Sequence, residues 1–360
     1  MKSLGNFPDP FIQEISGQPD AIRRAAEGLA DQLPLLESLA ESLATRTDGG
    51  RALVFTGMGS SYDACYPAVT ELAAAGVPAL QLDAAELLHF RLPLLGPGAV
   101  LVAVSQSGRS AEMVRLAGSL GAERRPLMVT VTNGADNPLA TGADIALDTM
   151  AGEEVGPSTM TFAASVVVLA AVGSVLAAES PGRAVAQLGA QSGHAARAAE
   201  RILADVELPH RLAAWLDGRG TVVLLARGPA RAAAEMGALT LKEAVGIPAE
   251  SLQTAQFRHG PLELAGPSLA AMIVATEPET RDLDLALAAE LAAAGAAVVV
   301  VTMGPADVPG ALVAPIDPVA RALAPAISIM PAQLLAWRLA VLAGREPGSY
   351  IQASKVTTRE

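Results

Sequence analysis

The most constraining feature of the chain is that one pattern of strands and helices occurs twice. An apolar run, a glycine turn and an Ala-rich helix fill residues 51–64, and the same order returns at residues 220–228 and beyond. Later segments repeat in the same way: residues 99–104 with 269–275, 127–132 with 296–302, 145–148 with 312–315, and an uncharged helix after Pro157 with an apolar helix at 325–343. This predicts an internal duplication with a period of about 170 residues.

The short apolar strands alternate with helices, which is typical of parallel sheets covered on both faces. We therefore predict an α/β protein with two tandem, doubly wound parallel sheets, each sandwiched by helices. A chain of 360 residues also exceeds the usual size of one core. The expected parts are an N-terminal arm and helix at 1–45, a first domain at 46–183, a helical link at 184–216, a second domain at 217–345 and a C-terminal tail at 346–360.

Charge and cysteine content limit the functional classes. The net charge of −12 and the pI near 4.9 argue against a general binder of nucleic acid or anionic membranes. The single cysteine, Cys65, has no internal disulfide partner, and the four histidines show no metal-ligand spacing. We expect a cytoplasmic protein without a secretory leader, metal or redox cofactor, and with Cys65 as a small buried side chain.

One uncharged segment, residues 155–178, is long enough to span a bilayer. Ala, Ser, Gly and Thr dilute its Val and Leu, and no basic cluster flanks it. A helix that is apolar all round also suits a core or a subunit interface. We therefore predict that this helix is buried in protein and that the chain has no membrane partner.

A serine-rich turn joins a predicted strand to a predicted helix at residues 105–110. Ser105, Gln106, Ser107 and Ser110 lie in this turn. A helix N-terminus presents unpaired amides and about half a positive charge, and serine hydroxyls add further donors. The turn therefore predicts a phosphate-binding loop, although a serine-capped turn without a ligand is the plainer interpretation.

A second loop of the same kind spans residues 57–62. Ser60 and Ser61 follow the strand at residues 52–55 and open a helix. Loops at the carboxyl ends of parallel strands share one edge of the sheet, where open α/β sheets bind ligands. The loop is not a dinucleotide fingerprint, because the third glycine and the acidic residue at the end of the next strand are absent.

These two loops, Gly-Ser-Ser at 59–61 and Ser-Gln-Ser-Gly-Arg-Ser at 105–110, resemble the sugar isomerase (SIS) domain, a phosphosugar-binding module. Three further motifs follow in the order seen in double-SIS proteins: Ala-Leu-Thr-Leu-Lys-Glu at 238–243, Arg-His-Gly-Pro at 258–261 and Lys-Val-Thr at 355–357. Together they resemble the isomerase half of glucosamine-fructose-6-phosphate aminotransferase. They are still more similar to the stand-alone SIS-type glucosamine-6-phosphate deaminase.

The resemblance implies roles for particular residues. Converting an aldose to a ketose needs ring opening and a proton transfer between carbons 1 and 2, tasks that suit a histidine and a carboxylate. By resemblance Glu243 is the enolisation base, and His259 opens the ring from a neighbouring subunit, which implies a homodimer with shared active sites. Lys355 and Ser354 then lie in a tail over the sugar. Without the resemblance, Glu243 is a solvated carboxylate, His259 a hydrogen-bonded turn residue and the tail a disordered terminus.

Two positions depart from the family pattern. Thr240 stands where relatives usually have a lysine that contacts the sugar, and Met160 replaces another lysine. The second half also reads Thr-Glu-Pro-Glu at 276–279, where the first half has its serine-rich turn. We therefore expect only the first half to hold the sugar phosphate, and the departures leave the sugar itself open.

The leading hypothesis is an isomerase and deaminase that converts glucosamine 6-phosphate to fructose 6-phosphate and ammonia, because no glutaminase segment with an N-terminal cysteine precedes the repeat. One alternative is a ketose–aldose phosphosugar isomerase, or a deglycase that acts on another amine adduct. An alternative of a different class is a phosphosugar-binding sensor without turnover. The usual form of such a sensor has a basic helix-turn-helix that these acidic first 45 residues do not offer.

Overall fold

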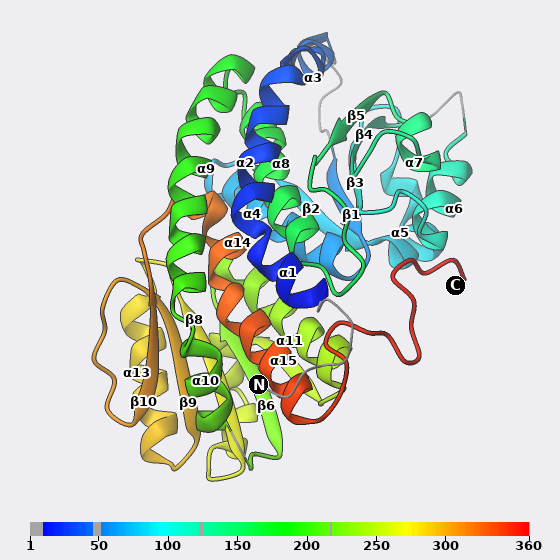
Figure 1. Ribbon diagram of the computed structural model, residues 1–360. Helices are drawn as coiled ribbons and strands as arrows, with labels where there is room; N and C mark the ends of the chain where they lie inside the picture. Colours follow the sequence, from blue (N-terminus) through cyan, green and yellow to red (C-terminus); the bar gives the residue numbers. More distant parts are fainter. Residues whose placement is uncertain (1–9, 46–51, 122–124, 217, 360) are drawn as a thin grey trace. The chain divides into compact units, whose positions relative to one another are not determined.

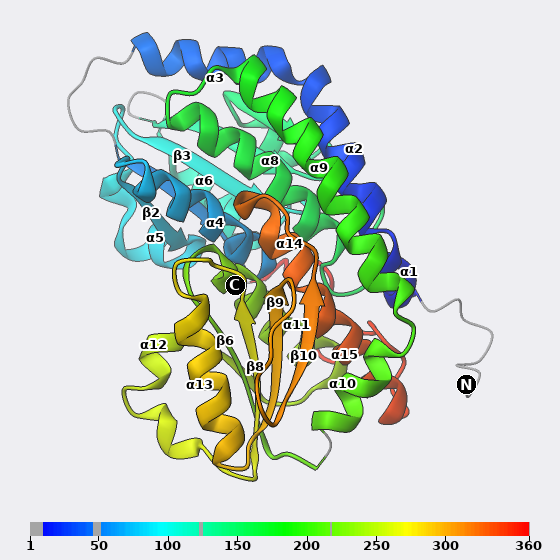
Figure 2. The same ribbon diagram turned by 90° about the vertical axis from the view of Figure 1, so that its left-hand side faces the viewer.

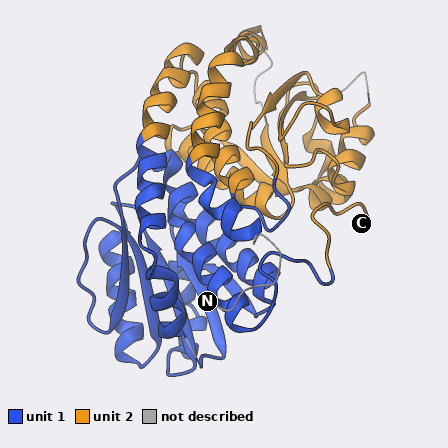
Figure 3. Cartoon of the chain, viewed as in Figure 1, with its two compact units in different colours: residues 1–19, 154–159, 194–352 blue, residues 20–153, 160–193, 353–360 orange. Residues whose placement is uncertain are grey.

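A computed structural model describes residues 10–45, 52–121, 125–216 and 218–359. The chain divides into two compact units (Figure 3). Unit 1 consists of residues 1–19, 154–159 and 194–352, and unit 2 of residues 20–153, 160–193 and 353–360. Residues 1–9 of the expected arm, and residues 46 and 217 where two expected domains begin, lie outside the described residues. The predicted domain boundaries stay a prediction.

Unit 2 contains a five-stranded parallel sheet with the strand order β2-β1-β3-β4-β5 (Figure 1). Its strands are β1 (Leu53–Gly57), β2 (Ala79–Asp83), β3 (Val100–Ser105), β4 (Leu127–Thr132) and β5 (Ile145–Asp148). The strand after β1 ends in Asp83, so the expectation that no acidic residue stands there is wrong, and the missing third glycine alone argues against a dinucleotide fingerprint. Every residue of β1, β3 and β4 is buried, because helices cover both faces of the sheet. Their continuous apolar sequences follow from that double burial.

The helices of unit 2 pack on both faces of this sheet. They are α3 (Leu33–Thr45), α4 (Ser60–Ala74), α5 (Ala84–Phe90), η1 (Leu92–Leu94), α6 (Ala111–Ser119), α7 (Pro138–Thr141) and α8 (Met160–Leu176). The helices α4 and α8 pack together against one face. On the other face, α5, α6 and α7 contribute Leu87, Met113, Leu116 and Leu139 to a common core.

Unit 1 repeats the architecture with the strand order β10-β9-β8-β6-β7, again parallel throughout (Figure 2). Its strands are β6 (Thr221–Ala226), β7 (Ala249–Gln253), β8 (Leu269–Ala275), β9 (Ala297–Met303) and β10 (Ala311–Ile316). The sequence therefore predicted the α/β class and the two parallel sheets correctly.

Helices cover the sheet of unit 1 in the same manner. They are α1 (Pro10–Ser16), α10 (Leu208–Leu216), η2 (Gly228–Ala230), α11 (Arg231–Val245), α12 (Thr254–Phe257), η3 (Pro261–Leu264), α13 (Arg281–Ala293), η4 (Arg321–Leu323), α14 (Ala324–Ser328) and α15 (Met330–Leu342). On one face α13 packs against β8 and β9, and Leu287 and Leu291 join the strand side chains there. On the opposite face α11 packs against β6 and α10 against β9, and α15 packs on both of these helices. Two long helices, α2 (Gln18–Asp31) and α9 (Pro181–Ala204), contribute residues to both units.

The uncharged helix after Pro157 is buried, as the sequence predicted. In α8, fifteen residues from Met160 to Leu176 are buried. Among the described residues, one helical stretch, Arg321–Leu342, is long and apolar enough to cross a membrane, and 72% of its most apolar window is buried inside the protein. Burial of that extent is typical of a helix in a protein core.

Cys65 is also buried, as expected, and its thiol donates to the carbonyl of Ser61 at 3.3 Å. Burial, followed by the charge of Asp63, raises the pKa of the thiol. The cysteine is therefore a protonated core residue on α4 and not a nucleophile.

Candidate functional site

The loop after β3 organises its serine hydroxyls with its own backbone. The hydroxyl of Ser105 accepts from the amide of Gly108 at 3.2 Å and lies 3.4 Å from the hydroxyl of Ser110. The hydroxyl of Ser107 accepts from the amide of Arg109 at 3.1 Å. A hydroxyl that accepts from the backbone keeps its own proton to donate. The helix α6 begins at Ala111, directly after this loop. These hydroxyls therefore lie at a helix N-terminus, which suits an anion.

Gly108 is required in this loop because Asn137 approaches it closely. Its φ is 60°, and a Cβ at this position would lie 1.8 Å from Oδ1 of Asn137. Asn137 in turn donates to the carbonyl of Gly134 at 2.7 Å and to the hydroxyl of Thr132 at 3.2 Å. It also accepts from the amide of Ala140 and so caps α7. We did not single out Asn137 in the sequence, although Asn followed by Pro is a helix-start signal.

The loop after β1 lies at the carboxyl end of the strand next to β3, so both loops share one edge of the sheet. Ser60 and Ser61 begin α4 and are half-buried. Gly57 permits the close approach, since a Cβ there would lie 2.9 Å from the backbone of Ser61 and 3.0 Å from the carbonyl of Val104. The structure thus places the two predicted loops together within unit 2.

The C-terminal tail contacts the same helix N-terminus (Figure 1). The carbonyl of Thr357 accepts from the amide of Ala111, the first residue of α6, at 3.0 Å. Ser354 donates to the carbonyl of Val356 at 2.8 Å, and Lys355 is half-buried. The tail from residue 353 therefore belongs to unit 2, together with both serine-rich loops.

Glu243 lies in unit 1 near the C-terminal end of α11 and is half-buried. Burial, followed by the negative charges of Glu243, Glu154 and Glu14, raises the pKa of Tyr350. The Tyr350 phenol thus stays protonated in a group of carboxylates and can donate a hydrogen bond. Sequence reasoning missed Tyr350, because its interaction with residues so distant in sequence depends on the fold.

Two of these carboxylates shape the loop at residues 154–159. Glu14 of α1 accepts from the amides of Val155 at 2.5 Å and Gly156 at 3.1 Å. Glu154 accepts from the amide and the hydroxyl of Thr159, at 2.8 and 2.9 Å. Both carboxylates are buried, and these donors compensate their burial. The loop directly before Met160 is therefore ordered by glutamates of its own unit.

Thr240 is fully buried on α11, and its hydroxyl donates to the carbonyl of Met236 at 2.8 Å. This backbone bond occupies the proton of the hydroxyl. The side chain that replaces the usual lysine therefore offers no charge and no free donor.

His259 lies in unit 1, in the turn between α12 and η3. Its amide donates to the carbonyl of Gln256 at 3.0 Å, and its side chain is exposed. Gly260 follows with a φ of 121°, which favours glycine. The turn thus fixes the backbone and leaves the ring exposed.

The predicted site residues divide between the two units. Unit 2 contains Ser60, Ser61, Ser105, Gln106, Ser107, Ser110, Ser354 and Lys355, and unit 1 contains Glu243 and His259. The carbonyl of Gln106 accepts from the amide of Asn133 at 3.0 Å, so its backbone is part of the loop structure. Over the described residues, no group of three His, Cys, Asp or Glu side chains is placed to hold a metal ion.

Two parallel, doubly wound sheets, one of them with serine-rich loops on a shared edge, define a class of tandem α/β proteins with an anion-binding site. The SIS domain model matches residues 50–175 and 216–343, so the chain belongs to the SIS domain family.

The relatives agree with this assignment. The glutamine–fructose-6-phosphate aminotransferase (isomerizing) of Pyrobaculum aerophilum is 28% identical over 367 residues, which cover 100% of this chain and 59% of that protein. The chain thus spans little more than half the length of this relative and is homologous to its isomerase half.

Solved structures share the fold. The C-terminal domain of the Francisella tularensis glucosamine-fructose-6-phosphate aminotransferase has a TM-score of 0.81 and 23% identity, over 94% of this chain and 97% of that one. The Thermotoga maritima glucosamine-6-phosphate deaminase has a TM-score of 0.70 and 19% identity, over 96% of this chain and 99% of that one.

Proposed function

We propose that the protein is an amino-sugar phosphate isomerase and deaminase. Glucosamine 6-phosphate and water are converted to fructose 6-phosphate and ammonia. The observation that most supports this proposal is the loop after β3, where the backbone of Gly108 and Arg109 fixes the hydroxyls of Ser105 and Ser107 beside the start of α6. Such a site suits a dianionic phosphate in a protein of negative net charge.

Each residue has a separate task in this proposal. Ser60, Ser61, Ser105, Ser107 and Ser110 bind the phosphate, with Gln106 and Ser354 as further sugar contacts. His259 opens the ring, and Glu243 moves the proton from carbon 2 to carbon 1, with Lys355 near the reacting carbons. Water then attacks the carbon–nitrogen double bond at carbon 2, and ammonia leaves as the ketone forms.

The proposed assembly is a cytoplasmic homodimer in which His259 acts in the site of the partner subunit. Its exposed side chain and the fixed backbone of its turn support a role outside its own unit. A closed two-fold dimer would give each active site groups from both chains.

A second candidate is a phosphosugar isomerase that moves the proton without releasing ammonia. Thr240 does not distinguish this candidate from the deaminase. Its buried, backbone-bonded side chain supplies no cation to the site, which favours the sensor without turnover. The same base and phosphate loop would serve both reactions. A sensor without turnover would use the phosphate loop and not Glu243.

An ammonia-release screen over amino-sugar phosphates and unaminated ketose and aldose phosphates tests the proposal. We expect ammonia and fructose 6-phosphate in equal amounts from glucosamine 6-phosphate, and neither from Glu243→Gln. If the protein isomerises unaminated sugar phosphates and releases no ammonia from any amino-sugar phosphate, the second candidate is established. If the protein binds a sugar phosphate tightly and converts none, the remaining alternative is the sensor without turnover.

A further inference from the structure

The second sheet repeats the backbone of the phosphate loops. Gly59 follows β1 and Gly228 follows β6 at the same spacing, and each has a φ of 52°. In unit 2 the strand β3 lies beside β1, and in unit 1 the strand β8 lies beside β6, so β8 corresponds to β3. The loops after β6 and β8 therefore share one edge of the sheet, as the loops after β1 and β3 do.

Strand pairing fixes which residues correspond. Ser105 at the end of β3 pairs with Thr132, and Ala275 at the end of β8 pairs with Thr302. The helices α6 and α13 begin at the same distance beyond these two residues. By this register, Glu277 occupies the position of Ser107, the serine expected to bind phosphate.

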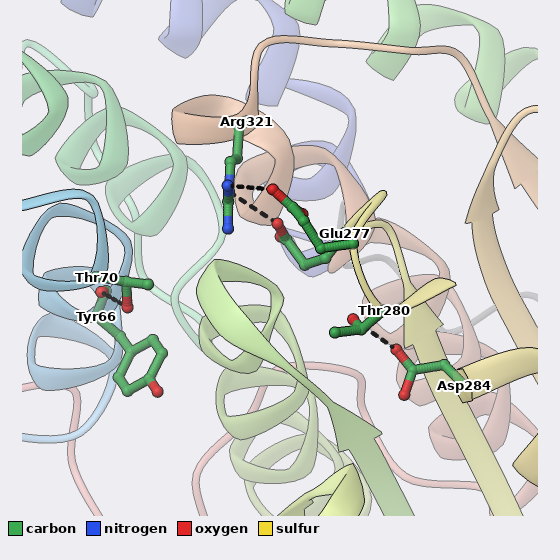
Figure 4. Close-up of polar contacts among 7 residues, drawn as sticks. Tyr66, Thr70, Glu277, Thr280, Asp284 and Arg321 are labelled. Carbon is green, nitrogen blue, oxygen red and sulfur yellow. Dashed lines mark hydrogen bonds and ion pairs between the residues drawn. The ribbon is translucent and has the colours of Figure 1, made fainter. Parts of the chain in front are cut away.

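The Glu277 carboxylate is neutralised by an arginine from a distant part of the chain (Figure 4). Nε of Arg321 lies 2.9 Å from Oε2 of Glu277, and Nη1 of Arg321 donates to Glu279 at 2.9 Å. Glu277 is 3% exposed and Arg321 39% exposed. A Cβ on Gly228 would lie 3.4 Å from Cγ of Glu277 and 3.8 Å from Nη2 of Arg321, so the pair lies against the loop after β6.

A buried carboxylate is costly unless it is paired, and an arginine beside a helix N-terminus is a cation suited to carboxylate or phosphate. We propose that unit 1 contains a second phosphate site, which the chain fills with the carboxylate of Glu277. Arg321 is the cation of this site. Removing the Glu277 carboxylate lets it bind a phosphate group. The wild-type chain then binds no phosphate in unit 1, whatever reaction it performs.

Calorimetric titration with inorganic phosphate tests this proposal on the full chain. Glu277→Ser restores the residue type of the first loop and is expected to bind one more equivalent of phosphate per chain than the wild type. The added equivalent disappears in Glu277→Ser combined with Arg321→Ala. Because the readout is a gain relative to the wild type, it is independent of whether the first loop binds phosphate as the proposed function requires.

Glu279→Ser is the matched control, since it removes the exposed carboxylate partner of Arg321 and leaves Glu277 in place. It is expected to gain no equivalent. A gain in Glu279→Ser equal to that in Glu277→Ser, or a gain that survives Arg321→Ala, would overturn the proposal.

Glu277→Gln provides a second variant that keeps the shape of the side chain. Melting temperatures of both Glu277 variants are compared in phosphate and in chloride at equal ionic strength. Phosphate is expected to raise the melting temperature of each variant relative to chloride. This increase is expected to exceed the increase for the wild type, even where the variant itself is destabilised. If neither Glu277 variant responds to phosphate more than the wild type, Glu277 does not fill an anion site.

Discussion

Glu243 is half-buried and lies close to Tyr350, whose phenol stays protonated. As a general base it would be needed for proton transfer and not for holding the phosphate, which the proposed function assigns to unit 2. We expect Glu243→Gln to lose at least about a hundredfold in turnover, the usual scale of general-base catalysis, with near-normal affinity. Exchange of the carbon-2 hydrogen with deuterated solvent measures this step. Exchange at the wild-type rate in the variant would assign the base to another residue.

The serine hydroxyls of the two loops in unit 2 should contribute directly to affinity. We expect Ser61→Ala combined with Ser107→Ala to weaken sugar-phosphate binding, at about 1.5 to 3 kcal/mol for each hydrogen bond lost to the dianion. Calorimetry measures the affinity, with Ser119→Ala at the end of α6 as a control outside the loops. Unchanged affinity would remove these hydroxyls from the phosphate site.

The turn that connects β3 to α6 depends on Gly108. Gly108→Ala would force an L residue into the left-handed region, at about 1 to 2 kcal/mol, and press its Cβ into Asn137. We expect a loss of stability and of phosphate affinity, measured by urea unfolding and calorimetry.

Gly118 on the exposed face of α6 provides the matched control for this glycine. A Cβ there would meet no atom within 4 Å, so Gly118→Ala should stabilise the helix by about 0.5 to 1 kcal/mol. Equal effects of the two substitutions would contradict the role given to the Asn137 contact.

The C-terminal tail caps α6 through one carbonyl. Removing residues 356–360 deletes Thr357 and its bond to Ala111, and we expect a higher KM for the sugar phosphate. Removing only residues 359 and 360 keeps the bond and should leave the KM near that of the full chain. Identical kinetics for the two truncations would show that the cap does not affect the site.

Most strands could be predicted from the sequence because double burial makes them continuous apolar runs. The edge strands β2 and β7 were missed, since Gln81 and Glu250 interrupt the apolar pattern and only one neighbouring strand pairs with each. The serine loops could be predicted because each directly follows a strand. The contacts of Asn137 with Gly108 and of Arg321 with Glu277 join residues far apart in sequence, so only the fold could reveal them.

For the whole molecule, the decisive prediction concerns shared active sites. A Glu243→Gln chain and a His259→Ala chain should each be inactive alone. After subunit exchange, about half of the dimers are mixed and regain one intact site each, which activity assays would detect. A monomer in sedimentation at assay concentration, or no recovery after proven exchange, would contradict the shared site.

Both units depend on segments from opposite ends of the chain, with consequences for how the protein is made. Unit 1 includes α1, and unit 2 includes the tail that reaches α6 through Thr357. On the ribosome, α1 emerges long before the sheet of its unit, and unit 2 lacks the bond between Thr357 and Ala111 until Thr357 has left the exit tunnel. Each unit is therefore interrupted by segments of the other, and neither can complete its folding until its last segment has emerged. In the meantime the emerging chain must keep two unfinished cores from aggregating.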